Sequence, residues 1–199
     1  MAKPSIRVFK ARDKDFNRCL SHAGYVRKTQ AIEMGMNKSR LNTYKAEGYI
    51  DRMYVYDKLT KMDEECFFLT DKGRNLVTDM MGIDSFYRSN GVKHDARLAE
   101  EYQKLTLEQQ RSWLTEKDLR EVFQDRMQEL RDQGHGLKAM ELERKMKSGL
   151  ISPGDGAYVG LDGQVMIIEI ITGNYGKVEI QAKEDFAQAV GGKIQLIKI

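Results

Sequence analysis

The chain has 199 residues, of which 41% are hydrophobic and 32% are charged, so it can bury a substantial core and is not composed like a disordered chain. No apolar run approaches the ~18 residues that a membrane-spanning helix needs, and the basic N-terminus lacks the apolar stretch of a signal peptide. We therefore expect a cytoplasmic protein without membrane contact. Its two cysteines, Cys19 and Cys66, do not have metal-site spacing and are expected to be reduced and buried.

Charge is distributed unevenly along the chain. Residues 1–60 contain 13 Lys and Arg against 6 Asp and Glu, whereas residues 150–199 contain 4 Lys against 6 acidic residues. A basic N-terminal half is typical of proteins that face nucleic acid, although ordinary solvated helices give the same pattern.

Residues 27–52 have the pattern of a helix-turn-helix. Thr29 is expected to cap the first helix, and Gly35 is expected to form the turn. Asn37 is expected to cap the second helix, which should end at Gly48. The start of such a second helix enters the major groove of DNA, so the pattern makes DNA the expected partner.

The segments around this pattern complete a domain over residues 1–83. One helix precedes it, and two β-prone runs and a helix capped by Thr70 follow it. This order is that of a winged helix-turn-helix, and the segment FFLTDKGRNLV resembles the end of the wing and the next helix in bacterial winged-helix regulators. The expected bounds are 13–21 for the first helix, 54–56 and 67–69 for the strands, and 57–65 for the loop.

The second helix of the pattern supplies most of the candidate DNA contacts. Lys38 and Arg40 are predicted to bond guanine edges, and Asn42 is predicted to pair with adenine. Lys45 and Arg27 are predicted to meet phosphates. Acidic residues 63–65 at the expected wing tip oppose this role, because they repel DNA. The predicted DNA-binding residues are Arg27, Lys28, Lys38, Ser39, Arg40, Asn42, Lys45, Lys58 and Lys61.

Residues 84–149 are expected to form a helical connector. Two capping boxes, each a threonine followed three positions later by Gln or Asp, open helices near residues 106 and 115. The adjacent His94 and Asp95 fit either a capping pair or a contribution to an acidic site. The helices themselves fit plain packing, a dimerisation arm, or the first helix of the next domain.

Residues 150–199 predict a hairpin, a helix and a final strand, which together suggest a small α/β domain. Asp162 and Gly163 form a strong hairpin turn, and this turn places Asp155 roughly opposite Glu169. A carboxylate within an apolar strand is costly to bury without a partner, and Mg²⁺ is commonly held by one or two carboxylates. Asp155 also fits a turn residue, and Glu169 also fits a structural ion pair with Lys183.

The order of Pro153, Asp155, a hairpin, Glu169 and a helix resembles the PD-(D/E)xK restriction-endonuclease-like superfamily. In active members the acids hold Mg²⁺, and a lysine two residues after the second acid helps to activate water. Here that position is Ile171, and Gly154 separates the proline from the aspartate. The resemblance implies Asp155 and Glu169 as metal-binding and catalytic residues with Mg²⁺ or Mn²⁺, if the site is active. Lys183 would then replace the missing lysine, with Lys177 as a weaker candidate.

A winged helix, a His-Asp segment and a PD-(D/E)xK-like tail together resemble the replication-relaxation proteins of plasmids, conjugative elements and phages. This resemblance implies an α+β protein that binds double-stranded DNA in mobilisation or replication, with an inactive nuclease-like tail. A relaxase, a replication protein or a second copy of the chain would be a further partner. Three alternatives stay open: an active Mg²⁺-dependent endonuclease, a winged-helix transcriptional repressor, and a tail that docks proteins.

Overall fold

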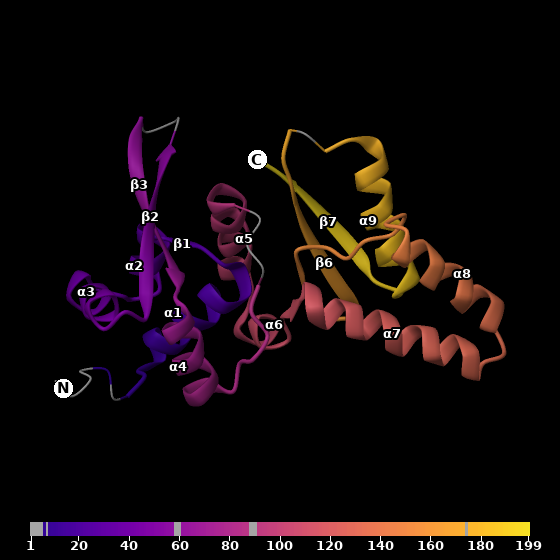
Figure 1. The fold of residues 1–199 in the computed structure, drawn as a ribbon, viewed down its shortest axis with the longest axis horizontal. Helices are drawn as coiled ribbons and strands as arrows, with labels where there is room; N and C mark the ends of the chain where they lie inside the picture. Colours follow the sequence, from indigo (N-terminus) through magenta and orange to yellow (C-terminus); the bar gives the residue numbers. More distant parts are fainter. Residues whose placement is uncertain (1–5, 7, 58–60, 88–90, 174) are drawn as a thin grey trace. The chain divides into compact units, whose positions relative to one another are not determined.

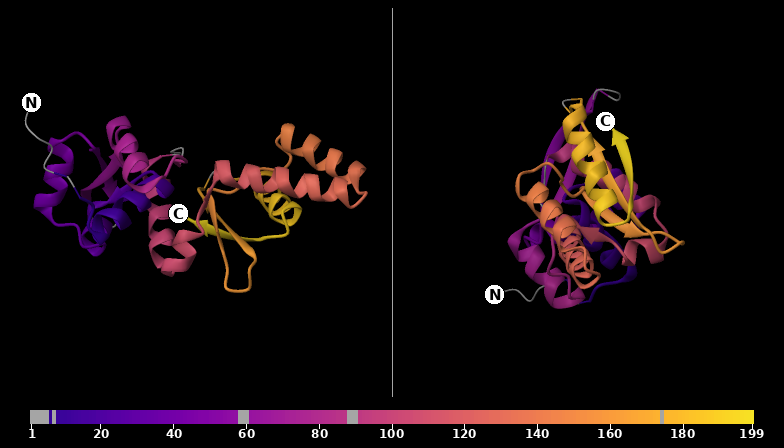
Figure 2. Two further views of the ribbon diagram at one scale, coloured as in Figure 1. Left: turned by 90° about the horizontal axis from the view of Figure 1, so that it is seen from below. Right: turned by 90° about the vertical axis from the view of Figure 1, so that its right-hand side faces the viewer.

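The computed structural model describes residues 6, 8–57, 61–87, 91–173 and 175–199. The fold is α+β and divides into two compact units, Met1–Lys104 and Leu105–Ile199, each with its own small sheet (Figure 1). Figure 2 shows both units from two further directions. Within the described residues, no helix has the length and apolar character to cross a membrane.

The N-terminal unit packs its helices around a three-stranded antiparallel sheet in which β3 lies between β1 and β2. Two predicted caps are confirmed: the side chain of Asn37 accepts the Arg40 N–H at 2.8 Å, and Thr70 Oγ1 accepts the Gly73 N–H at 3.0 Å. The elements are α1 (Ala11–Ala23), β1 (Val26–Arg27), α2 (Lys28–Glu33), α3 (Lys38–Ala46), β2 (Ile50–Asp57), β3 (Met62–Leu69), α4 (Asp71–Met81) and α5 (Val92–Lys104).

The start of α2 differs from the prediction that Thr29 caps this helix. The helix begins two residues earlier, with Arg27 as its N-cap, because the side-chain oxygen of Gln30 accepts the Arg27 N–H at 2.7 Å and so closes the first turn. Thr29 lies inside the helix and donates its hydroxyl to Glu64 at 2.9 Å. Thr29 therefore joins this helix to strand β3, a long-range contact that local sequence cannot show.

The hairpin is also longer than expected, because the predicted loop over 57–65 is wrong. Strand β3 begins at Met62, and Glu64 and Glu65 pair in register with Val55 and Tyr54. A run of acids resembles a loop, but both of these carboxylates have cationic partners within the fold. Polarity alone therefore did not mark the end of the strand.

The core of the N-terminal unit explains why its two cysteines are buried. Phe16 of α1 lies edge-on to Tyr44 of α3 at 6.0 Å and to Phe67 of β3 at 6.4 Å between ring centroids. Cys19 and Cys66 are free thiols in this core, as expected, and burial raises their pKa values to about 12 and about 11. Helix α5 packs against α1, so residues 92–104 belong to this unit, not to a connector.

The C-terminal unit joins the remaining expected connector helices to the tail. Leu119, Phe123 and Met127 of its long helix share one core with Ile167 and Phe186 of the tail, so the expected boundary at residue 150 falls inside a single core. Thr106 and Thr115 both form their predicted capping boxes. The elements are α6 (Leu107–Arg111), β4 (Leu114–Thr115), α7 (Glu116–Asp132), α8 (Gly136–Lys147), β5 (Gly156–Val159), β6 (Val165–Ile171), α9 (Lys177–Ala189) and β7 (Lys193–Lys198).

The second sheet has the order β4-β5-β6-β7, with β6 among its inner strands. Strands β5 and β6 form the predicted antiparallel hairpin, whose turn includes Gly163 at a φ of 77°. Helix α9 then carries the chain to β7, which pairs parallel to β6. From Ile167 to Ile171 every residue of β6 is buried, which agrees with the apolar run in the sequence.

Candidate nucleic-acid interface and carboxylate site

Helix α3 presents a polar stripe to solvent because its opposite stripe is buried. Leu41 and Tyr44 face the core, at 2% and 0% exposure. Lys38, Asn42 and Lys45 are spaced by four and three residues, so they share the other side of the helix. Lys38 and Asn42 are exposed, and Lys45 is half-buried.

This stripe borders a hollow of about 180 Å³ that is lined by α2, α3 and the β2–β3 hairpin. Four cations and one carboxylate line the hollow, so its net charge is strongly positive and suits an anionic ligand such as a phosphate. Asn42 adds a neutral side chain that can read a base edge. The lining residues are Lys28, Lys38, Leu41, Asn42, Lys45, Arg52, Glu65 and Phe67.

Glu65 organises three of these cations. Its carboxylate oxygens lie 2.9 Å from Lys28 Nζ, 3.3 Å from Lys45 Nζ and 3.2 Å from the Arg52 guanidinium. Burial alone would raise the pKa of Glu65, but the bonds from these three cations lower it to about 2. The carboxylate therefore stays charged and holds the cations around the hollow, so it does not act as the repulsive tip that the sequence suggested.

Glu64 has a similar role for another predicted DNA contact. Its carboxylate lies 3.3 Å from Arg27 Nε and accepts the Thr29 hydroxyl. Arg27 and Lys28, both predicted to contact DNA, thus have acidic partners at the base of the hairpin. Lys61 is exposed at the turn end of the hairpin, whereas Lys58 lies outside the described residues.

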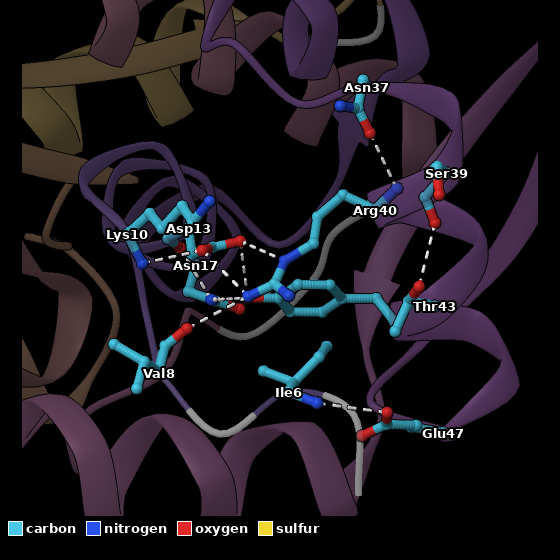
Figure 3. A network of polar contacts seen from close by, with 11 residues as sticks. Ile6, Val8, Lys10, Asp13, Asn17, Asn37, Ser39, Arg40, Thr43 and Glu47 are labelled. Atoms are coloured by element: carbon cyan, nitrogen blue, oxygen red, sulfur yellow. Dashed lines mark hydrogen bonds and ion pairs between the residues drawn. The ribbon is translucent and has the colours of Figure 1, made fainter.

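Arg40 turns away from this surface and packs toward α1 (Figure 3). Its Nε donates to Asp13 Oδ1 at 2.8 Å, and its Nη2 donates to Asp13 Oδ2 at 3.0 Å and to the Val8 carbonyl at 3.2 Å. Asp13 is fully buried, and the bond to it raises the pKa of Arg40. The guanidinium that was predicted to read guanine thus balances a buried carboxylate in this structure.

Three further residues from the sequence analysis have modest roles. Ser39 is exposed beside Lys38, and its carbonyl accepts the Thr43 hydroxyl at 3.0 Å. His94 and Asp95 are buried in the core of the N-terminal unit, where His94 Nδ1 lies 3.2 Å from Asp95 Oδ1. That burial supports a structural role for the pair.

In the C-terminal unit the structure brings Asp155, Glu169 and Lys183 together. Asp155 precedes β5, and its N–H donates to the Ile168 carbonyl at 3.0 Å. The Ile170 N–H donates to Asp155 Oδ2 at 2.8 Å, so this carboxylate is held beside the middle of β6. Glu169, the residue between them on β6, is fully buried.

Gly154 explains the altered Pro-Gly-Asp spacing. The chain passes so close to β6 at this point that a Cβ would collide with the Ile167 side chain and the Ile168 carbonyl. Only glycine permits this approach, which places Asp155 alongside Glu169. Gly154 thus permits the close backbone approach next to Asp155.

The two oxygens of Glu169 have different surroundings. Oε1 accepts the Tyr175 hydroxyl at 2.8 Å and lies 3.1 Å from Lys183 Nζ, which also donates to the Pro153 carbonyl at 2.6 Å. Among the described residues, Oε2 has no hydrogen-bond partner. Burial and then the charge of Asp155 raise the pKa of Glu169, while Lys183 and Tyr175 oppose that rise.

A buried carboxylate oxygen without a partner is chemically informative, because such groups are nearly always satisfied by a donor, a proton or a cation. Asp155 and Glu169 could supply two ligands to a divalent metal, and Lys183 could orient a water or phosphate beside them. Within the described residues no group of three or more His, Cys, Asp or Glu forms a metal cluster. The candidate site therefore has two carboxylates, a lysine and a tyrosine.

The structure bears on the two lysines and the isoleucine named in the sequence analysis, and it adds a tyrosine. Lys183, not the exposed Lys177, reaches Glu169, and Ile171 is buried where the resemblance would place a lysine. Tyr175 was not among the predicted site residues, although its hydroxyl contacts Glu169. Burial and the Glu169 charge raise the pKa of Tyr175, so its hydroxyl remains a donor.

Comparisons of the chain with protein-family models, with curated proteins and with solved structures gave no match.

Proposed function

We propose that the protein binds double-stranded DNA through α3 and the β2–β3 hairpin. The observation that carries this proposal is the outward stripe of Lys38, Asn42 and Lys45 beside the basic hollow. Cations at this spacing meet phosphates, and an exposed asparagine between them suits an adenine edge. We place the protein in the mobilisation or replication of a plasmid, conjugative element or phage, with a relaxase, a replication protein or a second copy as partner.

The order of elements supports a winged helix-turn-helix as the scaffold for this activity. Helices α1, α2 and α3 precede the β2–β3 hairpin, and β1 adds to β3 at the edge of the sheet. In this arrangement α3 takes the place of the recognition helix and the hairpin takes the place of the wing.

Fluorescence anisotropy with a labelled duplex of random sequence tests the proposal. Removing both lysines of the stripe, as Lys38→Ala/Lys45→Ala, should weaken binding at low salt by about tenfold or more, because phosphate contacts supply most of non-specific affinity. Lys14→Ala is the matched control, since Lys14 is exposed on α1 outside the hollow. A folded wild-type protein that binds no duplex at low salt would refute the function.

Selection of duplexes from a random pool tests whether the protein also reads sequence. Asn42→Ala should relax the preference at one position, since a bidentate base contact discriminates by about 1–3 kcal/mol. Arg40→Ala should leave the selected sequence unchanged in whatever fraction of the protein remains folded, because its guanidinium is bound to Asp13.

For the C-terminal unit we propose a nuclease-like module that lacks hydrolytic activity. The antiparallel β5–β6 hairpin, α9 and the parallel β7 support this relationship. Ile171 at the usual lysine position supports the absence of activity. An active Mg²⁺-dependent endonuclease is the second candidate, and the contact of Lys183 with Glu169 beside Asp155 favours it. Asp155 and Glu169 would hold the metal, which would supply Lewis-acid activation of a phosphate or water.

Supercoiled plasmid with Mg²⁺ or Mn²⁺ separates the two candidates. An inactive module leaves the plasmid intact, whereas nicking that Glu169→Gln abolishes would establish the endonuclease. Relaxation of water protons by Mn²⁺ reports metal binding independently of cleavage. Glu179→Gln, on the exposed first turn of α9, is the matched control for loss of one carboxylate.

A further inference from the structure

One face of strand β2 carries an exposed aromatic pair. Arg52, Tyr54 and Tyr56 alternate along the strand, so their side chains share a face while Met53 points to the other. Tyr54 and Tyr56 are 54% and 53% exposed. Tyrosine rings that stay exposed on a strand contribute little to the core, and they are well suited to contact a ligand.

This aromatic face continues from the basic hollow. Arg52 lines the hollow, and its guanidinium lies 5.4 Å from the centroid of the Tyr54 ring. Across the hairpin, Glu65 faces Tyr54 and Asp63 faces Tyr56. Glu65 is already paired with three cations, so the exposed Asp63 is the acid that a ligand would meet beside the outer ring.

The chemistry of the face favours unpaired bases over a base-paired duplex. A duplex covers the faces of its bases by stacking them on one another, whereas an unpaired base offers a free π-face to a tyrosine. Side chains two residues apart on a strand are separated by about 7 Å, and sheet aromatics of this kind stack two or three bases in RNA-binding domains. The neighbouring Arg52 and Lys45 supply cations for the backbone of the same strand.

We propose that Arg52, Tyr54 and Tyr56 form a stacking site for two unpaired bases of DNA adjoining the duplex that α3 holds. This site rests on the proposed duplex-binding function and extends it to a junction between paired and unpaired DNA. Its ligand class is single-stranded DNA of any sequence, because stacking on an aromatic ring is tolerant of base identity.

The test uses the full chain and three labelled ligands: a duplex, the same duplex with a thymidine overhang, and a thymidine single strand. Wild type should bind the overhang ligand more tightly than the blunt duplex. Tyr54→Leu/Tyr56→Leu should lose that preference and bind the single strand at least about tenfold more weakly, with a clearly smaller loss of blunt-duplex affinity. Tyr54→Phe/Tyr56→Phe should keep the preference, because the rings remain.

Controls make each outcome decisive. Met53→Leu changes an exposed apolar residue on the opposite face and should leave all three affinities unchanged. If the double leucine variant melts earlier than wild type, Tyr56→Leu alone, farther from the core, provides the same comparison. Equal affinity of wild type for blunt and overhang ligands, or a preference that survives the leucines, overturns the stacking site. The stacking site is also overturned if analytical ultracentrifugation shows a wild-type dimer that Tyr54→Leu/Tyr56→Leu dissociates without changing the affinity for the overhang ligand. If the wild type bound none of the three DNA ligands, the proposed function itself would be refuted.

Discussion

Removal of Arg40 is expected to destabilise the N-terminal unit, because it leaves the carboxylate of Asp13 buried without its counter-charge. Breaking a buried ion pair on one side costs about 3–5 kcal/mol. Asp13 would keep the Lys10 N–H at 2.8 Å, and the Arg40 side chain is 17% exposed, so water can reach the gap. We therefore expect Arg40→Ala to lower the free energy of unfolding by about 3 kcal/mol, at the lower end of that range.

The chain offers a probe for this unit alone. Cys19 and Cys66 are its two cysteines, and both are buried in the N-terminal unit. The reactivity of these thiols in increasing urea therefore reports the unfolding of that unit. Arg40→Ala should shift the midpoint to lower urea, whereas Asp13→Asn/Arg40→Met should recover much of the loss, because no unpaired charge remains buried.

Lys38→Ala is the matched control, since Lys38 is exposed on the same helix and its removal should change stability by less than about 0.5 kcal/mol. If Arg40→Ala left the urea midpoint unchanged and instead removed a guanine preference from selected duplexes, the ion pair would not be its role. The assignment of Arg40 to the core would then be refuted.

Three further substitutions test other parts of the structure. Glu65→Gln should cost about 1–2 kcal/mol, since half-exposed ion pairs are worth up to about 1 kcal/mol each. Because the pKa of Glu65 is lowered from 4.5 to about 2, that stability is present above pH 4.5 and is lost as the pH falls toward 2, so melting curves of mutant and wild type should converge in acid. Lys38→Ala should reduce the slope of log affinity for duplex against log salt by about 1, and an unchanged slope would place the phosphates elsewhere. Gly154→Ala should destabilise the C-terminal unit by about 3 kcal/mol through overpacking. Trp113 fluorescence during unfolding measures this loss. Gly136→Ala is the control and should not destabilise the unit, because a Cβ at Gly136 meets open space.

The sequence predicted those parts of the fold that depend on neighbouring residues. The caps at Asn37, Thr70 and Thr115 and the turn at Gly163 are local structures, with hydrogen bonds or backbone angles set within a few positions. The strands β1 and β4 span two residues each, too short to show any alternation. Glu64 was assigned to a loop and not to a strand, because its ion-pair partner, Arg27, is 37 positions earlier in the sequence.

The candidate sites divide in the same way. Counting back from one hairpin turn was enough to set Asp155 opposite Glu169, but the contact with Tyr175 depends on how the chain bends after β6. Arg40 could have been assigned correctly, since it lies one helical turn before the buried Tyr44 and so borders the core. Its positive charge within a helix-turn-helix pattern suggested a DNA contact instead.

The arrangement of the hairpin has a mechanical consequence. Among the described residues, strand β1 pairs only with Cys66 and Phe67 of β3, so the sheet has three strands at the base of the hairpin and two farther out. The basic hollow lies at the three-stranded end, and Tyr56 lies on the two-stranded part. Outer amide protons should therefore exchange with solvent faster than those near Phe67, since local opening there breaks fewer contacts. On the proposed function, the basic hollow would hold the DNA rigidly, whereas the outer part of the β2–β3 hairpin could adjust to DNA of varying geometry.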